Sequence, residues 1–121
     1  MNFLKDCMEI KKVDLKYELV WTNVIEEDIR ELKIPIDSFL NLKSRLMSDY
    51  FLKYPLNKTN RIINVPENIR YIKFGDYRLF IFINEDNLTV YCLRLIHRKE
   101  CYSKKSINNL LTIIEELRNL K

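Results

Sequence analysis

The sequence predicts an α+β fold in two layers, with a helical hairpin packed on the apolar face of an antiparallel sheet. Two observations lead to this prediction. Residues 69–102 read as three β-strands joined by short turns, and apolar residues repeat at helical spacing on both sides of that stretch. A chain of 121 residues can bury a core of its own, so we expect one domain over residues 1–121. The expected order is an N-terminal strand, a helical hairpin, a three-stranded antiparallel meander and a C-terminal helix.

The first part of the chain supplies the N-terminal strand and the first helix. Residues 1–14 form a charged extension to which the sequence assigns no role, and residues 15–21 alternate enough to be a strand. Thr22 or Asn23 then caps a helix that carries acidic residues in its first turns, where the helix dipole favours them. Pro35 ends this helix because proline lacks the backbone N–H that a helix needs.

A second helix follows the proline and completes the helical hairpin. It starts at Asp37 or Ser38 and runs to about Lys53, with apolar residues at helical spacing. Residues 55–68 then form a polar loop rich in Asn, Lys and Arg. We expect the hairpin to cover the apolar face of the sheet.

The turn at Gly75-Asp76 sets the register of the meander. Gly75 is the only glycine in the chain and lies between two strand-like runs, which predicts a two-residue hairpin with a positive φ at glycine. Because side chains alternate along a strand, one face should carry Phe74, Tyr77, Ile72, Leu79, Ile81 and Ile83. The other face should carry Lys73, Arg78, Tyr71, Phe80 and Phe82. Lys73 lies opposite Arg78, an unfavourable pair that suits a surface for phosphate and bases or, alternatively, a solvated strand end on which the cations splay apart.

Positive charge is concentrated in the meander and the segment after it. The chain carries 21 Lys and Arg against 17 Asp and Glu, a net charge of +4. All of this excess falls between residues 70 and 105. The cations there are Arg70, Lys73, Arg78, Arg94, Arg98, Lys99, Lys104 and Lys105. This distribution indicates a polyanionic partner, with nucleic acid as the leading candidate.

The composition argues against metal, disulfide and membrane functions. Cys7, Cys92 and Cys101 are widely spaced and His97 is the only histidine, so no usual zinc set forms and reduced thiols in a cytosol are expected. The longest apolar run, residues 79–83, is too short to span a membrane, and the charged N-terminus lacks the apolar core of a signal peptide. We therefore expect a cytoplasmic protein without a metal or other cofactor.

The end of the chain predicts an amphipathic helix. Apolar side chains repeat at helical spacing within residues 103–121, and the N-cap is either Ser103 or Ser106. A cap at Ser103 places Lys104 and Lys105 at the positive end of the helix dipole, at a cost of about 0.3–1 kcal/mol each, whereas a cap at Ser106 leaves them in a basic loop.

Two segments of the meander resemble motifs of the RelE/ParE toxin superfamily. Residues 75–78, Gly-Asp-Tyr-Arg, with the apolar strand 79–83 after them, look like the family's G-D-Y-R strand. Residues 93–102, LRLIHRKECY, look like its LR-x-x-HR-K/R-x-x-Y segment. The two segments come in the family's order and at its distance, while residues 1–14 have no counterpart. The resemblance implies a RelE-like fold and a toxin that a small antitoxin holds inactive.

The resemblance also implies roles for individual residues. RelE-type members cut mRNA in the ribosomal A site without a metal, because the RNA's own 2′-hydroxyl attacks the adjacent phosphate. Arg78 matches the strand arginine that contacts the scissile phosphate, Arg98 resembles the arginine that stabilises the transition state, and Tyr102 resembles the tyrosine that stacks on a base. Lys73 corresponds to a lysine proposed as a base or an electrostatic stabiliser. Tyr71 stands where some members have a second lysine, which leaves the identity of the general base open.

The basic stretch holds further candidates for RNA binding: Tyr71, Arg70, Arg94, His97, Lys99, Lys104 and Lys105. Histidine is the usual proton-transfer residue near neutral pH, but alternation places His97 and Arg98 on opposite faces unless the strand ends or bulges first, which favours a structural role. Arg94 lies opposite Arg78 if the second turn has three residues, 85–87, and turns away if it has four.

Two function classes remain open on the sequence. The first is the toxin of a type II toxin–antitoxin system, an endoribonuclease that cleaves mRNA on the ribosome, with a cognate antitoxin as its protein partner. The second is a non-catalytic binding protein on the same scaffold, either a ParE-like gyrase inhibitor or a degenerate toxin. The presence of Arg78, Arg98 and Tyr102 favours the first.

Overall fold

The computed structural model describes residues 16–62, 65, 68–101 and 103–119. The predictions for residues 1–14 and for Tyr102 lie outside these residues. The elements are β1 (Glu18–Trp21), α2 (Val24–Glu31), α3 (Ile36–Leu46), α4 (Asp49–Lys53), β2 (Asn60–Arg61), β3 (Ile69–Phe74), β4 (Tyr77–Asn84), β5 (Thr89–His97) and α5 (Lys104–Asn119). The α+β class and the predicted element order are confirmed, with β2 as an additional strand inside the predicted polar loop. Among the described residues, no helix combines the length and the apolar character that crossing a membrane requires.

The strands form one five-stranded sheet in the order β1-β5-β4-β3-β2. β1 runs parallel to β5 and the other neighbours are antiparallel, so the sheet is mixed rather than antiparallel throughout. The register of the β3–β4 hairpin is as predicted, with Lys73 opposite Arg78 and Phe74 opposite Tyr77. Gly75 has the expected positive φ, +58°. The single glycine therefore fixes which side chains share a face.

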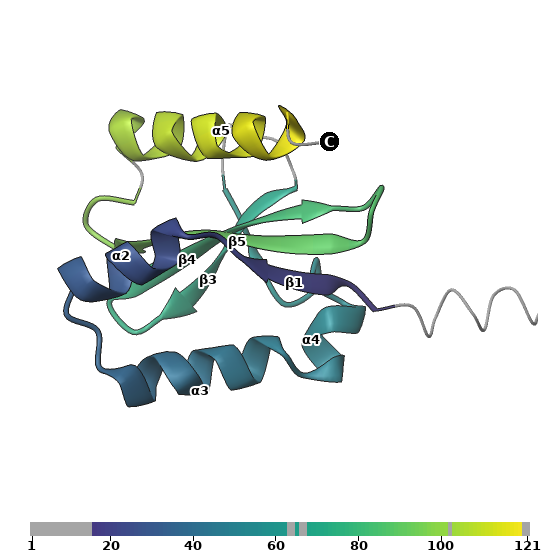
Figure 1. Ribbon diagram of the computed structural model, residues 1–121, viewed down its shortest axis with the longest axis horizontal. Helices are drawn as coiled ribbons and strands as arrows, with labels where there is room; N and C mark the ends of the chain where they lie inside the picture. Colours follow the sequence, from purple (N-terminus) through teal and green to yellow (C-terminus); the bar gives the residue numbers. More distant parts are fainter. Residues whose placement is uncertain (1–15, 63–64, 66–67, 102, 120–121) are drawn as a thin grey trace, which may run out of the picture.

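Helices lie on both sides of the sheet (Figure 1). α3 and α4 lie on one side, where residues such as Ile72 and Ile81 meet the apolar side chains of α2, α3 and α4. α5 lies on the other side, and its Leu110 packs in a second cluster with Phe80 and Phe82. Each face of the sheet thus has its own apolar cluster.

The predicted composition of the cationic face needs a correction. Phe80 and Phe82 do not share an open surface with Lys73 and Arg78, because α5 covers both rings and leaves Phe80 0 % exposed and Phe82 3 % exposed. Burying an aromatic side chain is favourable by about 1.5–3 kcal/mol, and the apolar stripe of α5 needs such a surface. The open part of this face is therefore confined to the end near the Gly75 turn.

The second predicted helix is two helices. α3 ends at Leu46, and the extended backbone of Ser48 (φ −69°, ψ 148°) breaks the chain direction before α4. The hydroxyl of Ser48 accepts a hydrogen bond from the N–H of Phe51 at 3.3 Å and so caps α4. Asn23 precedes α2 as predicted but makes no side-chain capping bond.

The cap of α5 is Ser103. Its hydroxyl accepts a hydrogen bond from the N–H of Ser106 at 3.1 Å. Lys104 and Lys105 therefore lie in the first turn of the helix, where the dipole disfavours positive charge. Of the two alternatives, the chain adopts the one with the electrostatic cost.

The position of Arg94 follows from a turn and a bulge. The turn between β4 and β5 spans four residues, 85–88, so the alternative of a three-residue turn is wrong and Ile96 lies opposite Arg78. A register shift next to Phe80 then places Arg94 opposite that residue, on the face that also carries Arg78. The expectation that a four-residue turn would turn Arg94 away from this face is therefore wrong as well, and α5 covers Arg94 there.

Candidate nucleic-acid site

The cations predicted for catalysis gather at the end of the β3–β4 hairpin. A cavity of about 450 Å³ there is lined by Tyr71, Lys73, Arg78, Arg98, Lys99 and Cys101. The sheet supplies the first three of these, and the segment after β5 supplies the rest. The main chain holds this segment against the hairpin turn, because the N–H of Arg98 donates to the carbonyl of Asp76 at 2.8 Å. The structure thus brings Arg78, Arg98 and Lys73 to one space.

The guanidinium of Arg78 is oriented by the turn beside it. Its Nη1 donates to the carbonyl of Gly75 at 3.0 Å and to the carbonyl of Tyr77 at 2.8 Å. These carbonyls fix the direction of the side chain without neutralising its charge. Its Nε and Nη2 donate to none of the described residues. That edge of the guanidinium can therefore hold two oxygens of one phosphate.

Lys73 adds a second cation directly across the hairpin from Arg78. Its side chain is exposed, and it forms an ion pair with none of the carboxylates in the described part of the chain. Like charges opposite each other on neighbouring strands destabilise a sheet. An anion bound between the two side chains would replace this repulsion by two attractions.

Arg98 completes the cationic lining together with Lys99. The Nε of Arg98 lies 3.7 Å from Oδ1 of Asp76, in a pair whose side chains are 56 % and 67 % exposed. Exposed pairs of this kind contribute only about 0–1 kcal/mol. Arg98 can therefore exchange Asp76 for a ligand at little cost, and positive charge dominates the cavity.

His97 lies outside the cavity lining. It pairs across the strands with Tyr77, and the two rings meet edge to face at 5.7 Å. Its Nδ1 accepts a hydrogen bond from the N–H of Lys99 at 3.2 Å. Tyr77 packs against the cluster under the hairpin helices, so His97 faces away from Arg78.

Arg94 is bound by two protein side chains. Its Nε and Nη2 donate to the two carboxylate oxygens of Asp28, each at 2.9 Å, and its Nη1 donates to Oδ1 of Asn109 on α5. Asp28 also accepts the N–H of Leu95 at 2.9 Å. All three guanidinium nitrogens are thus occupied, and a phosphate would have to displace a buried carboxylate. The sequence did carry a signal for Asp28, because it follows Ile25 by three residues on the buried stripe of α2.

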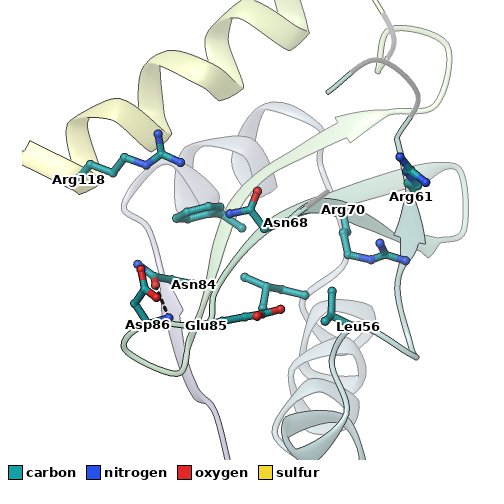
Figure 2. Close-up of a pocket in the computed structure, with 10 residues that line it drawn as sticks. Leu56, Arg61, Asn68, Arg70, Asn84, Glu85, Asp86 and Arg118 are labelled. Carbon is teal, nitrogen blue, oxygen red and sulfur yellow. Dashed lines mark hydrogen bonds between the residues drawn. The ribbon is translucent and has the colours of Figure 1, made fainter. Parts of the chain in front are cut away.

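Arg70 lines a different and larger cavity of about 790 Å³ (Figure 2). Its Nε and Nη2 donate to the hydroxyl and the carbonyl of Thr59, at 2.6 and 2.8 Å. The charged residues around this cavity are Arg61, Arg70, Glu85, Asp86 and Arg118. Figure 2 shows Arg118 projecting from α5 and Glu85 and Asp86 from the β4–β5 turn. The mixed charge gives no preference for a polyanion, and Lys73, Arg78 and Arg98 are not among the lining residues.

The remaining predicted residues lie beside the cationic cavity or outside the described residues. Tyr71 lines it, with its ring 6.1 Å from that of Phe80. Lys104 and Lys105 are exposed in the first turn of α5 and do not belong to the lining of this cavity. Tyr102 follows the lining segment directly but is not described.

The cysteines within the described range, Cys92 and Cys101, are buried free thiols. Burial raises the pKa of the Cys92 thiol, which therefore stays protonated. The thiol of Cys101 donates to the carbonyl of Arg98 at 3.2 Å beneath the cavity. No three His, Cys, Asp or Glu side chains of the described residues are grouped to hold a metal ion.

Comparison with known proteins places the fold. No protein-family model and no curated protein matches the chain. Among solved structures, the toxin–antitoxin complex RelBE2 from Mycobacterium tuberculosis aligns with 69 % of this chain and 100 % of its own, at 23 % identity and a TM-score of 0.55. A mutant of the E. coli toxin RelE in the free state aligns with 83 % of this chain and 99 % of its own, at 17 % identity and a TM-score of 0.60. Both alignments span the whole or nearly the whole compared chain, and this protein therefore has the fold of the RelE-type toxins.

Proposed function

We propose that this protein is the toxin of a type II toxin–antitoxin pair and an endoribonuclease that cleaves mRNA on the ribosome. The observation that carries the proposal is the cavity in which Lys73, Arg78 and Arg98 face one space. The structural neighbours support the toxin class, since one is described as a toxin and the other as a toxin–antitoxin complex. The proposed partners are a cognate antitoxin, mRNA and the ribosome, and the proposed compartment is the cytoplasm.

The proposed chemistry is attack of the RNA 2′-hydroxyl on the adjacent phosphate, which forms a 2′,3′-cyclic phosphate and breaks the bond to the 5′-oxygen of the next nucleotide. The hydroxyl loses its proton in this step and the leaving 5′-oxygen takes one up. This reaction builds negative charge on the phosphorane, and preorganised donors aimed at such charge lower the barrier most. Arg78 would hold two phosphate oxygens with the edge that the turn carbonyls leave free. Arg98 and Lys73 would add charge from either side, and Tyr102 would stack on a flanking base. Attack by the RNA's own hydroxyl needs no cofactor.

The test compares wild type with Arg78→Ala and Arg78→Lys. Loss of one preorganised donor costs about 10²–10³-fold in rate, so Arg78→Ala should cut ribosome-bound mRNA that much more slowly and should not arrest growth. Arg78→Lys should recover part of the rate, because lysine keeps the charge but lacks the planar fork. Primer extension on mRNA from programmed ribosomes measures the rate, and thermal unfolding verifies the fold of each variant.

Arg30→Ala is the matched control, because Arg30 is an exposed arginine on α2 outside the cationic cavity. It should cut and arrest growth as wild type does. An Arg78→Ala protein with wild-type cleavage would refute the assigned role. If the wild-type protein arrests growth but leaves mRNA intact, the endoribonuclease function is refuted and the alternative, a ParE-like binding protein, is supported.

A further inference from the structure

A second cavity adjoins the cationic one at the open edge of β3. It has a volume of about 380 Å³ and is lined by Arg45, Leu46, Ser48, Tyr50, Phe51, Lys58, Asn60, Ile72 and Lys73. Within the described residues, β2 pairs with β3 at Arg70 and Tyr71, and no other described strand lies beside this edge. Instead, the Nη2 of Arg45 on α3 donates to the carbonyl of Lys73 at 3.3 Å. The cavity thus lies between the hairpin helices and a sheet edge.

The lining of this second cavity suits a base that carries a phosphate. Its floor is apolar, with Leu46, Phe51 and Ile72 all buried. Tyr50 stands on the rim with 64 % of its surface exposed, so a ligand can reach its ring from solvent. Planar bases stack on such rings whatever their sequence.

Three cations surround this apolar floor. They are Arg45, Lys58 and Lys73, and no acidic residue belongs to the lining. The ammonium of Lys58 lies 3.9 Å from the centre of the Tyr50 ring and donates to its hydroxyl at 2.6 Å. Lys58 therefore lies over one face of the Tyr50 ring, and a base would stack on the other face. Aromatic rings next to cations are the combination that binds single-stranded nucleic acid. The charge balance disfavours a basic or neutral protein segment.

Lys73 lines both cavities, which makes them neighbours along one path. A strand whose scissile phosphate lies between Arg78 and Lys73 reaches the second cavity by passing over the edge of β3. We propose that the second cavity holds a nucleotide flanking the scissile phosphate, with its base on Tyr50 and its own phosphate on Lys58. This inference rests on the proposed endoribonuclease function and extends it to a subsite for the substrate.

The test removes the ring and the base separately and together. Cleavage of ribosome-bound mRNA is measured for wild type and Tyr50→Ala, with either an intact or an abasic nucleotide at each position flanking the cut. Stacking of a base on an aromatic ring changes rates or affinities by about 5- to 150-fold. At one flanking position, either Tyr50→Ala or the abasic nucleotide should slow cleavage by a factor in that range. Tyr50→Ala acting on the abasic substrate should be no slower than the slower of these two, because both changes remove the same stacking contact.

Tyr54→Ala is the matched control. Tyr54 is an exposed tyrosine whose ring lies 6.5 Å from that of Tyr50, but it does not line the cavity. It should respond to the abasic nucleotide as wild type does. Because Tyr50 is exposed, its replacement should leave the unfolding temperature unchanged.

The outcomes separate this inference from the proposed function. Wild-type cleavage by Tyr50→Ala on every substrate, with Arg78→Ala inactive, would overturn the subsite and leave the endoribonuclease intact. The same loss in Tyr50→Ala with and without the base would also overturn it, since the ring would then act on something other than that base. Unchanged cleavage with weaker neutralisation by the antitoxin would assign the cavity to the protein partner instead. A wild type that cuts no substrate would refute both.

Discussion

Replacing Asp28 by alanine should lower the free energy of unfolding by about 3 kcal/mol. β1 pairs with β5 as far as Cys92, so no described strand offers a partner to the outward N–H of Leu95. Asp28 accepts that N–H and two N–H groups of Arg94, all at 2.9 Å. One carboxylate therefore fastens α2, the bulged end of β5 and, through Arg94 and Asn109, α5.

The magnitude follows from the exposure of the two partners. Breaking a buried ion pair costs about 3–5 kcal/mol, because one charge stays behind without its partner. In Asp28→Ala the remaining charge is Arg94, which is 25 % exposed and keeps Asn109, so the lower end of this range applies. In Arg94→Ala the remaining charge is Asp28, which is only 4 % exposed, so the upper end applies.

The double variant Asp28→Ala/Arg94→Ala provides the decisive comparison. It removes both charges and leaves mainly the N–H of Leu95 unsatisfied, at a cost of about 1–3 kcal/mol. The double variant should therefore be more stable than the sum of the single losses predicts, and no less stable than Arg94→Ala alone.

Urea unfolding followed by the fluorescence of Trp21, the only tryptophan, measures these differences. A loss of about 3 kcal/mol shifts the midpoint by about 1–3 M urea. Asp49→Ala is the control, since Asp49 forms an exposed pair with Lys16 at 2.7 Å and should not shift the midpoint measurably. Additive losses in the double variant would refute the coupling, and an Asp28→Ala loss below 1 kcal/mol would refute the role of the network.

Two further predictions concern the backbone and a buried thiol. Gly75→Ala should destabilise the protein by about 1–2 kcal/mol, because φ at this position is +58°. An added Cβ meets nothing within 4 Å, so backbone strain is the only cost. A variant that unfolds in urea at the wild-type midpoint would contradict the left-handed turn. Burial raises the pKa of the Cys92 thiol, so the folded protein keeps a proton that the unfolded chain releases above about pH 8.5, and stability should fall as the pH rises past that value. The pH slope of the unfolding free energy measures this, and Cys92→Ala should flatten it; a slope that Cys92→Ala leaves unchanged would assign the effect to other groups.

The sequence predicted the elements that local rules determine. The lone Gly75 fixed the hairpin register, so the pairing of Lys73 with Arg78 was predictable to the residue. The presence of Lys73, Arg78 and Arg98 in one cavity was expected from a family resemblance, and the same register brings two of them together. The prediction that Phe80 and Phe82 lie on an open surface was wrong. The amphipathic pattern of α5 indicates that one side of this helix is buried, but it does not indicate which face of the sheet the helix covers.

Features that depend on tertiary contacts were not predictable from local patterns. The bulge that displaces Arg94 has no sequence mark of its own, since no glycine stands near it. The spacing of Asp28 from Ile25 indicates that Asp28 is buried, but its partners, the guanidinium of Arg94 and the N–H of Leu95, are brought to it only by the packing of α2 on β5. The second cavity joins α3, α4 and the edge of β3, three segments whose proximity only the fold creates.

The cationic end of the molecule contains two local costs that folding alone does not explain. Lys73 lies opposite Arg78 on neighbouring strands, and Lys104 and Lys105 occupy the first turn of α5 with no acidic residue beside them in that turn. A carboxylate at position 73 or 78 would remove the repulsion in the sheet, and one at position 104 or 105 would favour the helix dipole. The arrangement therefore lowers stability and raises the positive potential at this end of the molecule, which is the combination that the proposed binding of RNA would compensate.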